Sequence, residues 1–117
     1  DAKWTHIATL DVSSYASAID INNEGNLIVV GASMSRSADG STLIGRVFLF
    51  EESNDDGDES WSLVGYIDGN DDNEFGSSVA INESGSLMAA SSLQVGAFGN
   101  YVRVMEISCS EKSTSES

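Results

Sequence analysis

The sequence predicts an all-β protein made of two similar four-stranded antiparallel sheets. The main observation is an internal repeat, in which residues 15–32 align without a gap on residues 75–92 at a constant offset of 60 positions. Short apolar runs in both copies are separated by turns rich in Asn, Ser and Gly, and no segment has a helical period. Such a repeat of short strands is typical of propeller-like arrays, because one sheet of this kind cannot bury both of its faces alone.

The repeat continues on both sides of these segments. Trp4 aligns on Trp61 at an offset of 57, and Val47 aligns on Val102 at an offset of 55. The changes in offset fall where loops are expected. Residues 1–117 therefore form a single all-β domain, which we divide into repeat unit one (4–50), an acidic linker (51–60), repeat unit two (61–107) and a polar tail (109–117).

Each unit is expected to contribute four strands. The first strand begins at a tryptophan and alternates in polarity, as a half-buried strand does. The third is almost entirely apolar and is expected to be buried on both faces. The expected strands are 4–11, 16–21, 27–30 and 46–51 in unit one, and 61–68, 77–81, 87–90 and 101–107 in unit two. A two-sheet β-sandwich built from the same strands is the alternative fold.

The turn between the second and third strands is repeated as well. Gly25 and Gly85 occupy the turn position that most needs a positive φ angle, so both turns are expected to close tight hairpins. Asn82 begins an Asn-Glu-Ser pattern and is a candidate N-glycosylation site on a hairpin tip. The alternative role for Asn82 is to start the turn, as Asn22 does in unit one.

The charge of the chain restricts its partners. It carries 19 acidic and 5 basic residues, a formal net charge of −14. Such a surface repels phosphate backbones and anionic lipid headgroups, so we expect no nucleic acid partner. No stretch approaches the roughly 18 apolar residues of a membrane helix, so no membrane insertion is expected. Cations and basic protein surfaces are the favoured partners.

Several repeated residues resemble the FG-GAP type of β-propeller repeat. They are Phe75-Gly76, Gly31-Ala32, the run Gly45-Arg46-Val47-Phe48 and the two aligned tryptophans. This repeat occurs in tandem in integrin α-subunit heads and in many secreted or surface proteins. The resemblance implies loops that bind ligands, sites that often hold calcium and no catalysis. It also implies a secreted or cell-surface protein, with an organelle lumen as the alternative location.

One acidic loop is a candidate calcium site. Asp68, Asn70, Asp72 and Glu74 place oxygen ligands at every second residue, as a loop does when it wraps around a hard cation. The alternative interpretation is a solvated acidic turn. Residues 54–59 are a weaker candidate of the same kind. Calcium is the only cofactor that the sequence suggests.

The sequence offers no catalytic constellation. His6 is the only histidine and aligns with Leu63, so we expect it to be a partly buried packing residue. One His and the single Cys109 supply neither a zinc ligand set nor a nucleophile–His–acid arrangement. We therefore expect that the protein is not an enzyme. Trp4 and Trp61 occupy matching positions and are both expected to pack.

Two functions remain as alternatives. In the first, the chain is a structural module whose sheets pack with neighbouring chains or further repeats into a ring, a filament or a shell. In the second, it is a recognition module that binds a glycan or a protein through its loops. The first favours a homo-oligomer or a larger protein array. Its expected assembly face, left partly uncovered in a two-unit chain, comprises Ile28, Val30, Phe48 and Phe50.

Overall fold

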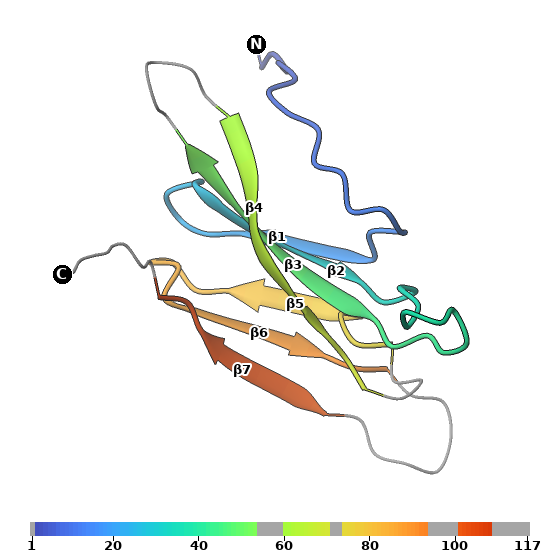
Figure 1. Cartoon of the computed structure of the whole chain (residues 1–117). Helices are drawn as coiled ribbons and strands as arrows, with labels where there is room; N and C mark the ends of the chain where they lie inside the picture. Colours follow the sequence, from blue (N-terminus) through green and yellow to red (C-terminus); the bar gives the residue numbers. More distant parts are fainter. Residues whose placement is uncertain (1, 54–59, 71–73, 94–100, 109–117) are drawn as a thin grey trace, which may run out of the picture.

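The protein consists of two antiparallel sheets, as a computed structural model describes it for residues 2–53, 60–70, 74–93 and 101–108 (Figure 1). The prediction of an all-β fold with two antiparallel sheets is confirmed. Among the described residues there is no helix, and hence none long and apolar enough to cross a membrane. Sheet one contains β1 (Ala18–Ile21), β2 (Leu27–Ala32), β3 (Arg46–Ser53) and β4 (Ser60–Asp68), in that order. Sheet two contains β5 (Ser78–Ile81), β6 (Leu87–Ser91) and β7 (Val102–Glu106).

The sheets do not coincide with the sequence units. β4 is the first strand of unit two, but it pairs with β3 and becomes the edge strand of sheet one. Its counterpart at residues 4–11 forms no strand, so the expectation of a strand there is wrong. Sheet two accordingly has three strands in the described part of the chain, not four. The physical reason is that the first strand of a unit pairs with the sheet before it, and the described structure holds no sheet before residues 4–11.

The two predicted hairpins are present and closely alike. Gly25 has a φ of 74° and Gly85 a φ of 78°, as predicted for both turns. In each hairpin an asparagine side chain accepts two backbone N–H bonds across the turn. The Asn22 Oδ1 atom accepts from Asn26 at 3.1 Å and from Leu27 at 3.0 Å. The hairpins place β2 and β6 in the middle of their sheets, as expected for the third strands.

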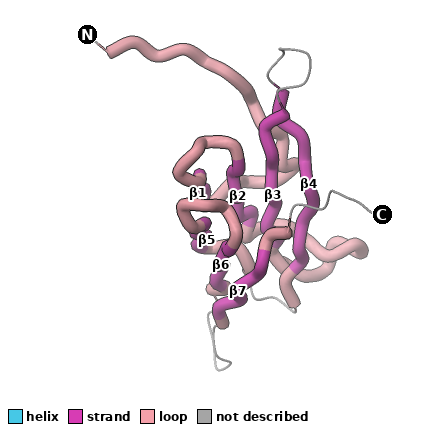
Figure 2. Tube along the Cα trace, turned by 90° about the vertical axis from the view of Figure 1, so that its left-hand side faces the viewer, coloured by secondary structure: helices cyan, strands magenta, loops and turns pink. Residues whose placement is uncertain are grey.

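A core lies between the two sheets. Val29 and Val47 of sheet one are almost completely buried, and Met88 and Ala90 of β6 pack against them from sheet two. The edge strands β1 and β5 are also joined by a hydrogen bond, since the Ile81 N–H donates to the Asp20 carboxylate at 2.9 Å. Figure 2 shows β1 beside β5 in this arrangement. The sheets are therefore packed on each other through one face of each.

The connection from β4 to β5 locks the sheets together. Phe75 is fully buried, and its N–H donates to the Ile44 carbonyl at 3.2 Å. Next to it, the backbones of Gly31 and Gly76 approach so closely that a Cβ on Gly31 would overlap the Gly76 carbonyl oxygen. Only glycine fits such an approach. The Phe-Gly and Gly-Ala steps of the sequence therefore serve the contact between successive sheets.

The N-terminal segment, residues 2–12, lies outside both sheets. It runs as an extended chain along the far side of sheet one, away from sheet two (Figures 1 and 2). Only its end is anchored, because Leu10 and Val12 pack against a second apolar cluster that contains Val30, Phe48 and Phe50. In the described part of the chain, none of its backbone groups pairs with a strand.

Candidate assembly surfaces

Four surfaces of the two sheets are defined by the strand registers. Residues that face each other across a pair of strands share a side, so Val29 with Leu49 marks one side of sheet one and Ala89 with Val104 one side of sheet two. The inner face of sheet one, which contacts sheet two, carries Leu27, Val29, Val47 and Leu49. The outer face of sheet one carries Ile19, Ile21, Ile28, Val30, Phe48 and Phe50. The inner face of sheet two carries Val79, Ile81, Met88, Ala90 and Met105. The open face of sheet two carries Ala80, Leu87, Ala89, Val102 and Val104.

The open face of sheet two repeats the inner face of sheet one. Leu87, Val102 and Val104 occupy the repeat positions of Leu27, Val47 and Leu49. Their exposed fractions are 43%, 64% and 67%, whereas the three residues of sheet one are exposed by 6%, 1% and 7%. The same apolar positions are thus covered in one sheet and uncovered in the other. The expectation that β6 is buried on both faces is wrong for this side of the strand.

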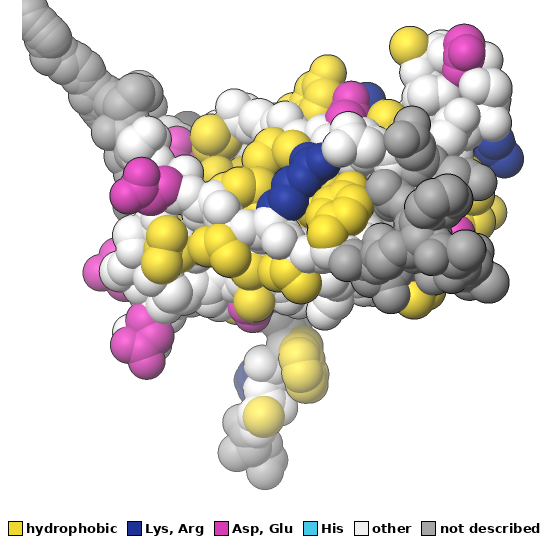
Figure 3. Space-filling model, turned by 90° about the horizontal axis from the view of Figure 1, so that it is seen from below, with side chains coloured by type: hydrophobic (Ala, Val, Ile, Leu, Met, Phe, Trp, Pro, Cys, Tyr) yellow, Lys and Arg dark blue, Asp and Glu magenta, His cyan; other side chains and the backbone are white. Residues whose placement is uncertain are grey.

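The lower side of the molecule, along β7, carries further apolar side chains. β7 is the lowest strand in Figure 1, and Figure 3 views the molecule from that side. Hydrophobic side chains gather there around a basic one, with acidic groups toward the rim. The open face itself carries one acid, because Glu106 lies opposite Leu87. In a protein with a net charge of −14, so many exposed apolar side chains on one face make it a candidate contact site.

The predicted assembly face is largely covered within the chain. Val30, Phe48 and Phe50 are exposed by only 3%, 5% and 5%, and Ile28 is half-buried. The expectation that these residues are left uncovered is therefore wrong for three of the four. The cause is the N-terminal segment, whose Leu10 packs on this cluster together with Trp61 of β4, a contact that the sequence did not reveal.

The outer face of sheet one is nevertheless incompletely covered. Ile19 and Ile21 of β1 are exposed by 67% and 50%. A groove of about 590 Å³ runs between this strand and the N-terminal segment, and it is lined mostly by apolar side chains, among them Ile7, Ile28 and Val30. The segment is thus a loose cover for a sheet face.

Two aromatic pairs of the repeat have opposite surroundings. Phe75 is fully buried and stacks on Tyr101 with ring centroids 5.9 Å apart, whereas its counterpart Tyr15 is 78% exposed. Trp61 is half-buried in the outer cluster, whereas Trp4 is 97% exposed. The expectation that both tryptophans pack is confirmed for Trp61 and wrong for Trp4.

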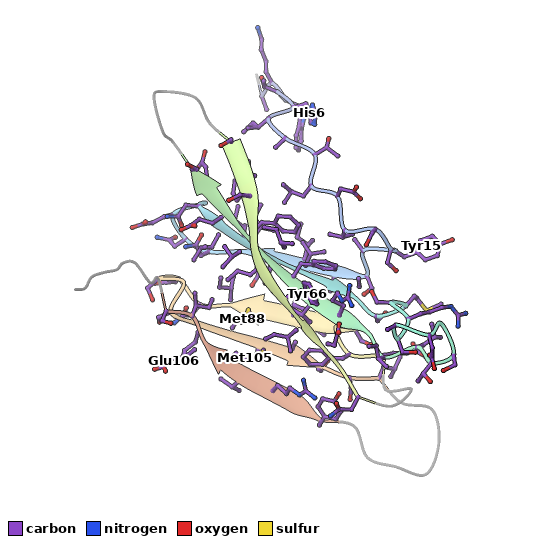
Figure 4. The ribbon with its side chains drawn as sticks, in the orientation of Figure 1. His6, Tyr15, Tyr66, Met88, Met105 and Glu106 are labelled. Atoms are coloured by element: carbon purple, nitrogen blue, oxygen red, sulfur yellow. The ribbon has the colours of Figure 1, made fainter. Side chains whose placement is uncertain are left out.

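His6 does not pack in the core either. Its side chain is exposed, and its Nε2 atom lies 2.9 Å from the Thr9 hydroxyl of the same segment. Figure 4 shows His6 on the N-terminal segment, where it helps to line the groove beside sheet one. The predicted packing role is wrong because the strand that would have placed His6 in a sheet is not formed.

The candidate calcium residues are only partly described. Asp72 lies outside the described residues, as do residues 54–59, so neither calcium prediction is tested there. The Asp68 carboxylate binds Arg46, with contacts of 2.5 and 3.3 Å to the Nε and Nη2 atoms. The described ranges contain no cluster of three or more His, Cys, Asp or Glu side chains suited to a metal ion. A calcium ion at Asp68 would have to compete with the Arg46 guanidinium, whose pKa is raised by this hydrogen bond.

The other two candidate calcium ligands, Asn70 and Glu74, belong to the connection from β4 to β5 and make contacts there. The Asn70 N–H lies 3.5 Å from the Tyr101 hydroxyl, which is the limit of a hydrogen bond. Glu74 has a φ of 51°, and its carbonyl accepts a bond of 2.8 Å from the Ser77 hydroxyl. Glu74 directly precedes the buried Phe75, and the Tyr101 ring stacks on Phe75.

Asn82 has the turn role that the sequence offered as one alternative. Its Oδ1 atom accepts bonds of 2.9 and 3.0 Å from the Ser86 and Leu87 N–H groups, and its Nδ2 atom donates to the Ser86 hydroxyl at 2.9 Å. A glycan on Nδ2 would replace one hydrogen of that donor. The side chain is exposed, and glycosylation of Asn82 stays a prediction.

A further hollow in the described surface has a mixed polar and apolar lining. It has a volume of about 790 Å³ and lies between the end of the N-terminal segment and the β2–β3 loop. Its lining includes Asp11, Tyr15, Arg36 and Arg46. In the same loop the pKa of Asp39 is lowered to about 2, because the Ser37 and Ser41 hydroxyls donate hydrogen bonds to its carboxylate. An exposed tyrosine beside charged groups is a surface that could contact a polar ligand such as a sugar.

Comparison with known proteins found no relative of this chain. The scan of protein-family models, the search of curated proteins and the search of solved structures each returned no match. The resemblance to FG-GAP repeats is not tested by these comparisons and stays a prediction. The sheets themselves are therefore the guide to function.

Proposed function

We propose that this protein is a non-catalytic structural module that assembles through its sheets. The open face of sheet two packs on the outer face of sheet one in a neighbouring copy, or in a further repeat of the same kind. The observation that carries the proposal is the pair of repeated faces, one buried and one exposed. Leu27 and Val47 make the contact between sheets inside the chain, and their counterparts Leu87 and Val102 are uncovered.

The partner surface is indicated by the contact already present. Inside the chain, the inner face of sheet one meets Met88 and Ala90 of sheet two. The repeat counterparts of these two residues are Ile28 and Val30, on the outer face of sheet one. A second copy that offers its outer face to the open face of sheet two repeats the same type of contact. The arrangement is head-to-tail, and it gives a ring if the rotation closes and a filament if it does not.

Charge opposes this association without preventing it. Each copy carries a net charge of −14, so copies repel one another at low ionic strength. Exposed charges farther apart than about 10 Å are largely screened at about 0.1 M salt, whereas the screening length is about 30 Å at about 0.01 M. We therefore expect the assembly to be stronger at the higher of these two salt concentrations.

The proposal is tested by Val104→Asp, with the particle mass measured by light scattering over a range of protein concentrations. A carboxylate buried without a partner costs about 3–5 kcal/mol, so we expect association at least ~100-fold weaker than in the unchanged protein. Met34→Asp is the matched control, because Met34 is 44% exposed and lies in the loop between β2 and β3. It adds the same charge without entering the open face.

The outcomes separate clearly. Assembly of the unchanged protein that Val104→Asp abolishes and Met34→Asp preserves supports the proposal. A mass of one chain for the unchanged protein at every concentration and salt level would overturn it and favour a monomeric two-sheet protein. An assembly that both variants weaken equally would indicate general charge repulsion and no specific open face.

A recognition function is the second candidate, and the hollow beside Tyr15 favours it. The tyrosine ring and the Arg36 side chain could contact a glycan or a protein loop there. We rank it second, because Tyr15 is the repeat counterpart of the fully buried Phe75. Tyr15 is therefore better explained as a packing residue whose partner is absent from the single chain. Binding of sugars to the monomeric Val104→Asp variant, lost on Tyr15→Ala, would support this candidate. A secreted or cell-surface location stays a prediction.

A further inference from the structure

We propose that residues 4–11 of one copy add to the free edge of β7 in a second copy and become the fourth strand of its sheet two. The inference rests on the proposed function and deepens it, since it names the segment that joins neighbouring copies. It is carried by three observations on the described residues. The segment is unpaired, the edge of β7 is unpaired, and the chain contains the corresponding pair of strands in sheet one.

The N-terminal segment has the sequence of an edge strand. Residues 4–11 align on residues 61–68, which form nearly all of β4. Both begin with tryptophan and end with aspartate. β4 obtains its hydrogen-bond partners from β3, whereas residues 4–11 have no backbone partner in the described structure. The segment therefore has the sequence of an edge strand but no strand to pair with in the described structure.

Sheet two has a free strand edge to which such a segment could pair. β7 pairs with β6 on one side, and no described strand pairs with its other side. The equivalent side of β3 holds β4 along its whole length, from Arg46–Asp68 to Ser53–Ser60. An unpaired strand edge exposes N–H and C=O groups that a second chain can satisfy by strand addition.

The β3–β4 register predicts the register of the proposed contact. We replace each residue of β3 by its repeat counterpart in β7, and each residue of β4 by its counterpart in residues 4–11. The resulting register places Leu10 opposite Val102, Ala8 opposite Val104 and Trp4 opposite Ile107. Ile7 takes the place of Val64, the residue that has no partner in the β3–β4 ladder. In this register Leu10 extends the open face of sheet two. Trp4 takes the strand position that Trp61 has in sheet one, where Trp61 lies opposite Glu52 of β3.

The charges of the two segments permit close pairing. Residues 2–12 contain one Lys and one Asp, and β7 contains one Arg and one Glu, so each segment is formally neutral in a chain of charge −14. Lys3 lies diagonally from Glu106 in the predicted register, on the same face of the sheet. Such a diagonal pair is within reach of long side chains. Repulsion between copies is thus weakest where the two backbones would meet.

The acceptor is a second copy because the segment lies on the wrong side of its own chain. In Figures 1 and 2 the N-terminal segment runs above sheet one, and β7 is the strand farthest below it. Figure 4 shows His6 and Glu106 at opposite ends of the molecule, although the proposed register brings them to neighbouring positions. Sheet one stands between donor and acceptor.

Strand addition and face packing support each other. β4 leads directly into β5, and the sheet that holds β4 packs on the sheet that begins with β5. By the same connection, residues 4–11 lead into β1. A copy that inserts this segment beside β7 of its neighbour therefore brings its own sheet one against the open face of that neighbour. The outer face of sheet one, from which the segment has departed, is then covered by the neighbour.

The register is tested by pairwise cysteine cross-linking in a Cys109→Ser background. One population carries Ala8→Cys and the other Val104→Cys, and the two are mixed and oxidised at a concentration where the protein is assembled. Opposite residues in a sheet bring their Cβ atoms to the distance of a disulfide bond. We expect a covalent dimer to form at least ~10-fold faster than with Thr9→Cys in place of Ala8→Cys, because adjacent residues of a strand point to opposite faces.

The outcomes distinguish this inference from the proposed function. Cross-linking at 8 and 104 between chains, with little at 9 and 104, supports strand addition. Assembly that persists without preferential cross-linking overturns the inference and leaves the proposed function standing. An absence of assembly overturns both. A disulfide within one monomeric chain that carries both cysteines also overturns the inference, because the segment would then fold back on its own β7.

A second variant tests the backbone contact without cysteines. Ala8→Pro removes an N–H group and is incompatible with a paired interior strand position. Residue 8 is exposed and unpaired in the single chain, so circular dichroism should show an unchanged fold. We expect the variant to be monomeric at concentrations where Ala2→Pro, outside the predicted ladder, still assembles. Equal masses for the two variants would overturn strand addition.

Discussion

Sheet one and sheet two carry the same apolar face, and only the first of them buries it. The residue types at the compared positions are alike, Leu27 with Leu87 and Val47 with Val102, so hydrophobicity does not explain the difference in exposure. The difference arises from chain order, because sheet one has a second sheet after it to cover its inner face. A repeat unit thus encodes half of a contact, and its burial depends on a neighbour.

The largest difference in stability is expected between substitutions of the repeat counterparts Phe75 and Tyr15. Phe75→Ala removes a fully buried ring and should lower the free energy of unfolding by about 3–5 kcal/mol. Tyr15→Ala, at the matching position, should change the stability of the single chain by less than about 0.5 kcal/mol. Urea unfolding of the two variants in the monomeric Val104→Asp background measures both values.

In the unchanged background, Tyr15→Ala should weaken assembly instead. Equal losses of stability from the two substitutions would break the comparison, because they would mean that Tyr15 is already packed in the single chain.

A smaller effect is expected at the turns. Asn22 is 5% exposed, so Asn22→Ala leaves one buried and one part-buried N–H group without their acceptor and should cost about 1–3 kcal/mol. Asn82 makes the same bonds but is exposed, and water can replace its Oδ1 atom. We expect Asn82→Ala to cost about 0.5–1 kcal/mol. Thermal unfolding of both variants checks the order, and a larger loss for Asn82 would contradict it.

The smallest effect is expected at Asp39, which lies outside all four faces. The folded-state pKa of about 2 is below the ordinary value of 3.8, so the carboxylate contributes stability above pH 3.8 that is lost as the pH falls toward 2. Asp39→Asn removes this dependence. We expect the urea midpoints of variant and unchanged protein to converge as the pH is lowered through this range, by a small amount because the side chain is fully exposed. Midpoints that diverge on acidification would contradict the stated direction.

Local features of the fold could be predicted from the sequence. The central position of β2 and β6 and the positive φ of Gly25 and Gly85 are determined by side-chain patterns within a few residues. The partner of β4 could not be found in this way. A strand that alternates in polarity fits the edge of either adjacent sheet, and periodicity does not indicate which.

The candidate surface was predicted in part. The sequence marks Ile28 and Val30 as apolar and repeated, but the segment that covers them, residues 2–12, itself has the pattern of a strand. The open face could have been found from the alignment alone. In a chain of two units, a face that is buried between them in one unit must be uncovered in the other, which points to Leu87 and Val102.

The irregularity in the β3–β4 ladder has a consequence for the form of any assembly. Leu49 pairs with Gly65 and Phe50 with Leu63, so Val64 is an extra residue that bends β4 and increases its twist. This bend sets the direction in which the chain leaves sheet one for sheet two, and every joint in an array inherits it. Deletion of Val64 should therefore alter the curvature of the array, and with it the number of copies per turn.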